Sequence, residues 1–156
     1  MSAASLSNIS QDLVWEIVRN NNSFSAKSKK NGGVQFSRDP LNLTNKASRK
    51  HAGFVNEKAI GVAVNEKGGV VVISKKGNSN KPAQNQTETT VTKASRKTYL
   101  TVANQTAKNG YRGDLRAAAV ERASAIRRSQ KPVKADHEVK LRGNRAKKAA
   151  AAAEAN

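Results

Sequence analysis

The chain has 156 residues, a formal net charge of +18 and a pI of about 10.7. Leu, Ile, Val and Phe together number only 29, and so few large apolar residues combined with high charge are typical of chains that fold on a partner. A compact chain of this charge repels itself unless a polyanion neutralises it. The composition therefore excludes one packed core over the whole length. It predicts a small core with long basic extensions, bound to nucleic acid.

The residues that catalysis and metal binding need are scarce. There is no Cys, which excludes disulfides, thiolate zinc sites and cysteine nucleophiles and favours a reducing compartment. His137-Glu138 begins like a zinc-protease helix, but Leu141 stands where the second His would be, and His51 has no carboxylate close to it in the sequence. We expect no enzyme activity, no cofactor, no metal and no small-molecule substrate. No stretch predicts a signal peptide or a membrane span, so no membrane partner is expected.

The first half of the chain predicts a helix followed by strands. Residues 1–22 are slightly acidic, with a net charge of −1, and residues 9–20 predict a helix capped by Asn8 or Ser10, with Trp15 in the core. A hairpin over 23–27 and 34–38 follows, closed by a basic turn that contains Asn31-Gly32. Residues 54–64 alternate like a strand, and residues 69–74 predict an inner strand covered on both faces, because Val-Val-Val-Ile is unbroken.

The second half predicts mainly helices. Residues 75–91 are polar and contain Pro82, so we expect a loop. Residues 92–109 predict a helix that ends at Gly110, and residues 114–130 predict another, capped by Asp114 and followed by Pro132. The fold class is therefore α+β, a small antiparallel sheet with a few packed helices. Residues 1–133 form an RNA-binding domain, and residues 134–156 form a basic, Ala-rich mobile tail.

The helix predicted over 114–130 has two different faces. Leu115, Ala119, Ala123 and Ile126 project to one side, and Arg116 and Arg127 fall on the adjoining flank. The helix could therefore dock on the sheet and present Arg to phosphate. Arg122 lies at the rim of the apolar face, where it either reaches past the core to RNA or marks the edge of that face.

Basic residues recur in the predicted loops. Lys-Ala-Ser-Arg-Lys occurs at 46–50 and again at 93–97, and such segments suit phosphate contact without reading of bases. Lys75, Lys76 and Lys81 form a charged extension after the inner strand. Solvated loops are the plain interpretation of such runs, but their recurrence in nearly every loop favours polyanion binding.

The segment 111–133, which begins Tyr-Arg-Gly-Asp-Leu-Arg and ends Lys-Pro-Val, closely resembles the signature of the eukaryotic large-subunit ribosomal protein 28e family. Further segments between residues 6 and 133 match in order, among them Leu13-Val14-Trp15, Phe36-Ser37, Gly61-Val62 and Lys81-Pro82-Ala83. Gly113 and Glu121 depart from the family pattern, so the start of the helix is expected to be looser and one RNA contact to be lost. The tail does not match.

The resemblance implies a structural constituent of the large subunit of the cytoplasmic ribosome, with transient nucleolar passage during assembly. The implied partners are large-subunit ribosomal RNA, including expansion segments, and neighbouring large-subunit proteins. The residues expected to bind RNA are Arg19, Lys27, Lys29, Lys30, Arg38, Lys46, Arg49, Lys50, Lys75, Lys76, Lys81, Arg96, Lys97, Arg112, Arg116, Arg122, Arg127, Arg128 and Lys131. A nucleolar assembly factor that shares this domain remains an alternative, as does a non-ribosomal basic protein that binds DNA or a membrane surface.

Overall fold

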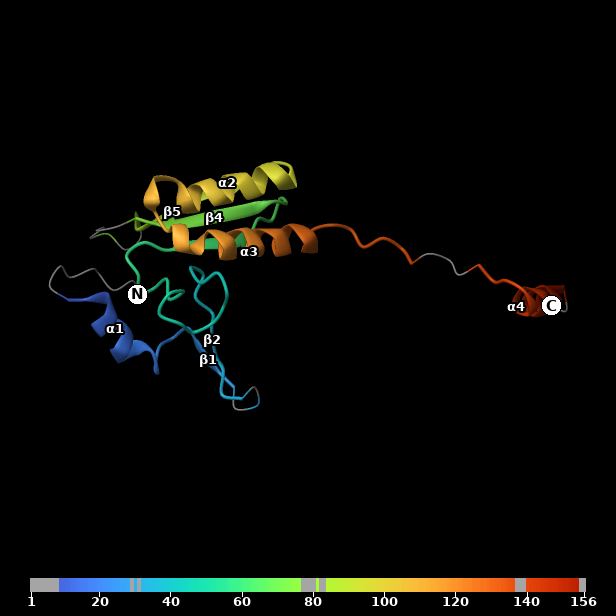
Figure 1. Cartoon of the computed structure of the whole chain (residues 1–156), viewed down its shortest axis with the longest axis horizontal. Coiled ribbons are helices and arrows are strands. Elements are labelled where there is room, and N and C mark those ends of the chain that lie inside the picture. Colours follow the sequence, from blue (N-terminus) through green and yellow to red (C-terminus); the bar gives the residue numbers. More distant parts are fainter. Residues whose placement is uncertain are drawn as a thin grey trace.

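The computed structural model describes residues 9–28, 30, 32–76, 81, 84–136 and 140–154 (Figure 1). The architecture is α+β, as the sequence predicts. Two antiparallel sheets, of two and three strands, combine with helices. The elements in chain order are α1 (Gln11–Val18), β1 (Ser25–Lys27), β2 (Gln35–Ser37), β3 (Ile60–Val64), β4 (Val70–Lys75), β5 (Gln86–Val91), α2 (Ser95–Ala107), α3 (Arg116–Ser129) and α4 (Asn144–Glu154).

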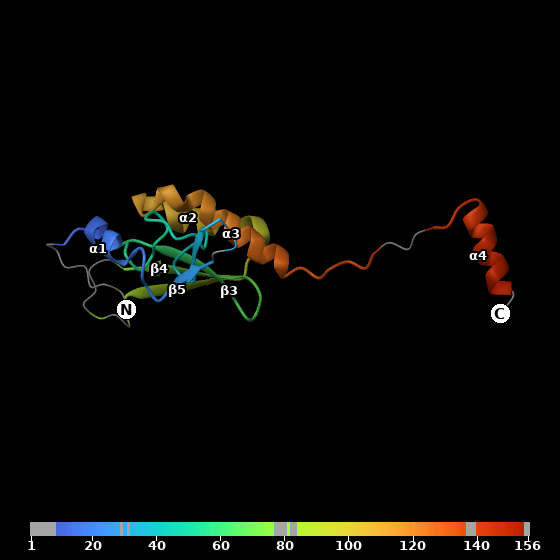
Figure 2. The same ribbon diagram turned by 90° about the horizontal axis from the view of Figure 1, so that it is seen from below.

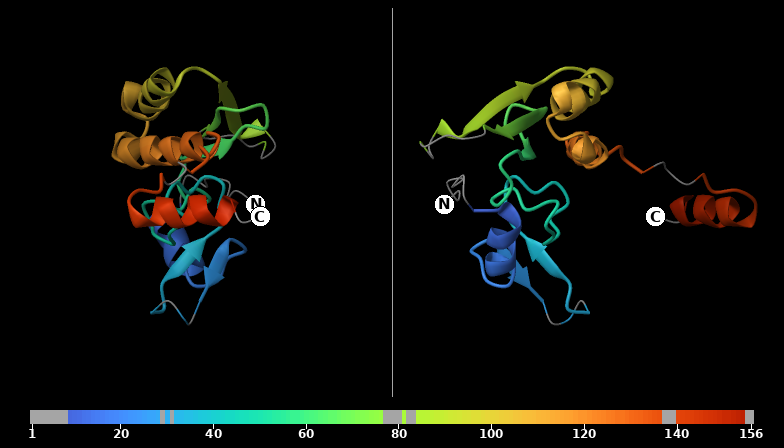
Figure 3. Two further views of the ribbon diagram at one scale, coloured as in Figure 1. Left: turned by 90° about the vertical axis from the view of Figure 1, so that its right-hand side faces the viewer. Right: turned by 60° about the vertical axis from the view of Figure 1, so that its left-hand side comes forward.

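The N-terminal helix and hairpin form as predicted. Ser10 caps α1, because its Oγ accepts a hydrogen bond of 3.2 Å from the backbone N–H of Leu13, which satisfies one of the free donors at a helix start. β1 and β2 pair antiparallel with Ala26 opposite Phe36. The prediction that Trp15 lies in the core is wrong, because this side chain is half-buried and outside the hydrophobic cluster. It lines a small pocket with Phe54 and residues of the hairpin. Figure 3 shows α1 and this hairpin grouped on the side of the molecule away from α2.

The three-stranded sheet has the order β3-β4-β5, with both pairs antiparallel. The prediction that Val-Val-Val-Ile forms an inner strand is confirmed, because β4 is central. Its two faces are not covered equally, since Val70 and Val72 are buried whereas Val71 and Ile73 are half-buried. The strand predicted over 54–64 is shorter than expected and occupies only Ile60–Val64. The residues before it form turns, in which Val55 and Asn56 donate their backbone N–H groups to the carbonyl of Ala52.

The third strand corrects the prediction of a loop over 75–91. Residues 86–91, Gln-Thr-Glu-Thr-Thr-Val, form β5 at the edge of the sheet, with Val91 opposite Val70. Five of its six side chains are exposed, so the strand has no apolar alternation to reveal it. Backbone pairing with β4 and the high strand preference of Thr hold it in the sheet instead.

The two predicted helices form an antiparallel pair beside the sheet. α2 and α3 lie side by side, and α3 packs on β3 and β4 (Figure 1). The prediction that Asp114 caps α3 is wrong. The helix begins at Arg116 after a 3-10 turn over Gly113–Leu115, no side chain caps it, and the Asp114 carboxylate is bound by Arg112 instead.

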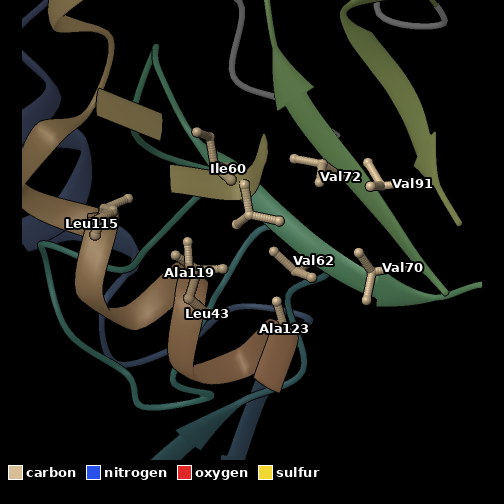
Figure 4. Close-up of a cluster of buried hydrophobic side chains, with 10 residues drawn as sticks. Leu43, Ile60, Val62, Val70, Val72, Val91, Leu115, Ala119 and Ala123 are labelled. Atoms are coloured by element: carbon tan, nitrogen blue, oxygen red, sulfur yellow. The ribbon is translucent and has the colours of Figure 1, made fainter. Parts of the chain in front are cut away.

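One hydrophobic cluster joins these elements (Figure 4). Leu115, in the turn before α3, and Ala119 and Ala123 of α3 are buried against the valines of the sheet. Ile126 packs at the edge of the cluster, as the projected apolar face predicts. Small Ala side chains let α3 approach the sheet closely, because the distance between packed elements depends on the side chains at the contact. The buried members are Leu43, Ile60, Val62, Val70, Val72, Val91, Val102, Leu115, Ala119 and Ala123.

The long loop between β2 and β3, residues 38–59, covers the side of β3 on which Gly61 lies. Gly61 is needed there, because a Cβ at this position would lie 2.4 Å from the carbonyl oxygen of Pro40. The buried Asp39 organises the loop, since its carboxylate accepts hydrogen bonds from the backbone N–H groups of Leu41 at 2.9 Å and Phe54 at 3.0 Å.

The C-terminal segment extends away from these layers. α4 lies far from the sheet and its helices (Figure 2), and it contains no buried residue. Whether residues 134–156 are mobile in solution, as the sequence predicts, stays a prediction. Across the described ranges, no helix is long and apolar enough to cross a membrane.

Candidate nucleic-acid interface

The structure divides the predicted RNA-binding cations into an inner and an outer set. The inner set has hydrogen-bond partners within the protein and comprises Arg19, Lys27, Arg49, Lys75, Arg112, Arg122 and Arg127. The outer set is exposed, with no side-chain partner among the described residues, and comprises Lys30, Arg38, Lys46, Lys50, Lys76, Arg96, Lys97, Arg116, Arg128 and Lys131. Lys81 is exposed but belongs to neither set. Lys29 lies outside the described residues.

Arg122 ties α3 to the sheet. Its Nε donates to the carbonyl of Val62 in β3 at 2.8 Å, and its Nη1 donates to the carbonyl of Leu43 and to Oδ1 of Asn45, both at 3.1 Å. In the structure the guanidinium therefore bonds groups of the protein at the rim of the apolar face. It closes the edge of that face by satisfying buried carbonyls. Contact of Arg122 with RNA stays a prediction.

Arg112 fixes the start of α3 in the same way. Its guanidinium forms two 2.8 Å hydrogen bonds with the carboxylate of Asp114 and donates to the carbonyls of Lys58 and Lys50. The hydrogen bond from Arg112 also lowers the pKa of Asp114 below its ordinary value. A charge engaged in this way is already neutralised at short range.

Lys75 corrects the prediction of an exposed basic extension after β4. The side chain is turned inward and its residue is only 5% exposed. Its ammonium donates to the carbonyls of Gly53 at 3.2 Å and Asn56 at 2.7 Å, and burial lowers its pKa. Lys76, the next residue, is exposed as predicted. Only the second lysine is therefore placed to meet a phosphate.

Arg49 holds the N-terminal helix against the loop. Its Nε donates to the carboxylate of Asp12 at 2.8 Å, and its Nη1 donates to Oδ1 of Asn56. In the second copy of the Lys-Ala-Ser-Arg-Lys repeat, the corresponding Arg96 is exposed at the start of α2. The two copies therefore have different structural roles.

The remaining inner cations make weaker contacts. Arg19 pairs with Glu16 at 3.2 Å on the exposed side of α1, where such a pair contributes little to stability. The Lys27 ammonium donates to the carbonyl of Asn20. Arg127, expected beside Arg116 on one exposed flank, is half-buried and donates to Oε1 of Gln130 at 3.3 Å. Arg116 alone of that pair is fully available.

Lys46 and Lys50 form a positively charged region, which we call the loop cluster. His51 lies among these residues, and its Nδ1 is 3.0 Å from the Ser48 hydroxyl. Burial lowers the pKa of His51, and the positive charges of Lys50, Arg112 and Lys46 lower it further, against an opposing effect of Asp114. Lys46 and Lys50 give this region the positive charge that a surface for an RNA backbone requires.

Among the described residues up to position 131, the predicted RNA-binding set omits four exposed cations, Lys58, Lys67, Lys93 and Lys108. Lys58 has its ammonium 6.0 Å from the ring centre of Tyr111, and Lys67 and Lys93 occupy turns at the other end of the sheet. Lys93 opens the second repeat and could have been recognised there. Single lysines in turns carry no such pattern. In the part of the chain that the structure describes, no group of His, Cys, Asp or Glu could hold a metal ion.

Comparison with known proteins agrees with this arrangement of a small core and exposed cations. The ribosomal L28e protein family matches residues 13–129. The chain belongs to this family. The large ribosomal subunit protein eL28 of Schizosaccharomyces pombe is 43% identical over 129 residues, which cover 81% of this chain and 96% of the relative. The eL28 proteins of Dictyostelium discoideum and Caenorhabditis elegans are 39% and 35% identical, over 79% and 78% of this chain and 93% and 91% of theirs.

The L28e match covers the folded layers and omits α4. All of the outer cations except Lys131 lie within the matched residues. The family consists of ribosomal proteins, which agrees with the prediction that the chain is not an enzyme.

Proposed function

We propose that this L28e protein is a structural constituent of the large subunit of the cytoplasmic ribosome and binds large-subunit ribosomal RNA through its outer cations. The relatives are named as large ribosomal subunit proteins. Assembly through the nucleolus and contact with expansion segments and neighbouring subunit proteins belong to the same proposal.

The main support is the outer set, ten exposed Lys and Arg side chains that have no side-chain partner in the part of the chain that the structure describes. The chain has 11 acidic residues against 29 basic ones, and several of the acids already serve the fold. Asp39 binds backbone N–H groups, and Asp12 and Asp114 bind Arg49 and Arg112. The remaining positive charge repels itself, and the phosphates of RNA supply the missing counter-charge.

The proposed mechanism is positioning of RNA by backbone contact. A-form RNA is recognised mainly through its shape, phosphates and 2′-hydroxyls, whereas single strands need exposed aromatic rings on which bases stack. The aromatic residues here are engaged in packing. Phe24 contacts Phe54 at a ring distance of 5.4 Å, and Tyr99 and Tyr111 pack against the core. The chemistry of the surface therefore favours helical RNA.

Charge reversal on α3 tests the proposal. Arg116→Glu with Arg128→Glu alters two exposed side chains that bond to no other side chain within the described ranges, whereas reversal of Arg127 would also disturb Gln130. A tagged double variant is expected to be recovered at least several-fold less from salt-washed large subunits, because each lost phosphate contact weakens binding. Lys147→Glu with Lys148→Glu, in the unmatched α4, is the control with the same charge change and is expected to stay near the wild-type level.

The fraction in which the protein sediments decides between the alternatives. The proposal expects the wild-type chain in mature large subunits after a high-salt wash. An assembly factor would appear only with precursor particles, and a non-ribosomal DNA-binding protein would appear with neither. Either of these outcomes would overturn the proposed function.

A further inference from the structure

The strongest unassigned feature is the end of the molecule where α2 begins and α3 ends. The two helices run antiparallel, so these two termini lie at the same end of the pair (Figure 1). The turn between β3 and β4 is held at this end by Gln130, whose side-chain amide donates to the carbonyl of Gly69 at 2.6 Å. Its Oε1 accepts from the N–H of Gly69 at 3.0 Å.

The end of β5 lies against the same β3–β4 turn. Gly69 lies so close to β5 that a Cβ on it would be 2.5 Å from the carbonyl oxygen of Val91 and 3.0 Å from the Cα of Thr92. Lys93 follows directly and leads into α2. The Gln130 side chain therefore joins the end of α3 to the β3–β4 turn, and the close approach of Gly69 to the backbone at Val91 and Thr92 brings the same turn against the segment that leads into α2.

Each of these segments brings exposed positive charge. We call the group the hairpin-end cluster; its members are Lys67 from the turn, Lys93, Arg96 and Lys97 from the start of α2, and Arg128 and Lys131 from the end of α3. None of the six has a side-chain partner among the described residues. Glu66, also exposed, is the one acid in the turn beside Lys67.

The start of α2 lacks the acidic residues and the side-chain cap that normally complement a helix N-terminus. Its first turn contains Arg96 and Lys97 and no acid, and its N-cap residue, Ala94, makes no side-chain hydrogen bond. The N-terminus of a helix carries partial positive charge, which acidic side chains normally complement. Two cations placed there add to the positive potential rather than cancel it.

We propose that the hairpin-end cluster is a phosphate-binding surface for an RNA double helix, in which Lys67 and Lys93 act together with the cations of α2 and α3. The inference rests on the proposed function and adds to it a particular surface and the form of RNA that this surface binds. The half-buried Tyr99 packs against the core rather than in the cluster, so this surface provides charge without a stacking platform.

A binding assay with the full chain tests the surface. Binding of a labelled RNA duplex of arbitrary sequence is measured over a range of salt concentrations for the wild type and two variants. The first variant combines Lys67→Gln, Lys93→Gln, Arg96→Gln and Lys97→Gln. The control removes four charges from the C-terminal segment through Lys140→Gln, Arg142→Gln, Lys147→Gln and Lys148→Gln.

The two variants should behave differently. Each lost phosphate contact lowers the slope of log affinity against log salt by about 0.9, so the hairpin-end variant should lose a slope of about 3 to 4 and bind at least about tenfold more weakly. The control variant should lose only a small fraction of that salt slope and of that affinity. Equal losses in the two variants, or none in the first, would overturn the surface while leaving the proposed function standing. A wild type that does not bind would instead count against the proposed function.

Crosslinking in assembled subunits provides an independent measurement. A photo-reactive amino acid at position 67 is expected to crosslink to RNA in purified large subunits. The same group at position 17, on the exposed side of the acidic helix α1, is the control and is expected to yield far less RNA product. Crosslinks from position 67 to protein alone would contradict the proposal.

Discussion

At the scale of single residues, adjacent cations in this protein can have opposite roles. Lys75 and Lys76 are identical in type and neighbouring in sequence, yet the first is buried with its ammonium on two carbonyls and the second is exposed. A strand alternates its side chains between two faces, so the last residue of β4 points into the loop. The sequence could predict that both are basic but not that Gly53 and Asn56 supply acceptors for one of them.

The Lys75 and Lys76 pair predicts separate effects on stability and binding. Lys75→Met leaves two buried carbonyl groups without a donor and should lower the free energy of unfolding by about 2 kcal/mol. Lys76→Met should change it by less than about 0.5 kcal/mol, because exposed side chains without partners contribute little to stability. Denaturant unfolding of the two variants measures the difference. Equal losses of unfolding free energy would show that Lys75 is not buried on the carbonyls of Gly53 and Asn56.

His51 predicts a response to RNA binding. Its lowered pKa means that the unfolded chain binds this proton more readily, so the contribution of His51 to stability is present above pH 6.5 and is lost as the pH falls through the lowered pKa. Phosphates placed at the loop cluster would offset Lys50 and Lys46 and raise the pKa of His51. An NMR titration with and without an RNA duplex measures the shift, and an unchanged pKa would exclude RNA from this cluster.

At the scale of elements, the predictions succeeded where apolar spacing decides the structure. The buried face of α3 and the inner strand β4 follow directly from their Ala, Leu and Val positions. β5 has five exposed side chains, so only its pairing with β4 makes it a strand. The start of α3 depends on whether the Asp114 carboxylate caps the helix or binds Arg112. In the structure it binds the guanidinium of Arg112. Neither outcome is visible in local sequence.

Arg122 and Arg128 of α3 provide a matched pair at this scale. Arg122→Met keeps the apolar stem but removes three hydrogen bonds that join α3 to β3 and the loop, which should cost on the order of 3 kcal/mol of unfolding free energy. Arg128→Met, on the exposed side of the same helix, should leave stability within about 0.5 kcal/mol and weaken RNA binding instead. Thermal unfolding and RNA titration of both variants measure the two effects. A loss of stability in Arg128→Met together with weaker RNA binding only in Arg122→Met would contradict the assignment.

At the scale of the whole molecule, the candidate site could be predicted as a type of surface but not residue by residue. Net charge and recurring basic loops indicated a polyanion partner, yet they could not separate cations that hold the fold from cations that remain available. That separation depends on which carbonyls and carboxylates the folded chain brings near each guanidinium or ammonium. Arg49, Arg112 and Arg122 illustrate it, because their partners lie on distant segments.

We expect the C-terminal helix α4 to be only marginally stable in the free protein. α4 has 11 residues and buries none of them, and isolated helices of this length are marginal in water even when rich in Ala. Amide hydrogen exchange of the free chain should therefore show little protection over residues 144–154 and clear protection in α3. Comparable protection in the two helices would mean that α4 is stabilised by contacts within the chain.

The most direct measurement of the central claim is a density map of this chain in the mature large subunit. The account predicts RNA phosphates beside the exposed Arg116, Arg128 and Lys131 and beside Lys46 and Lys50, with Lys75 and Arg122 still bound to their own carbonyls. A map in which the exposed cations face solvent or protein, and RNA lies elsewhere, would contradict it.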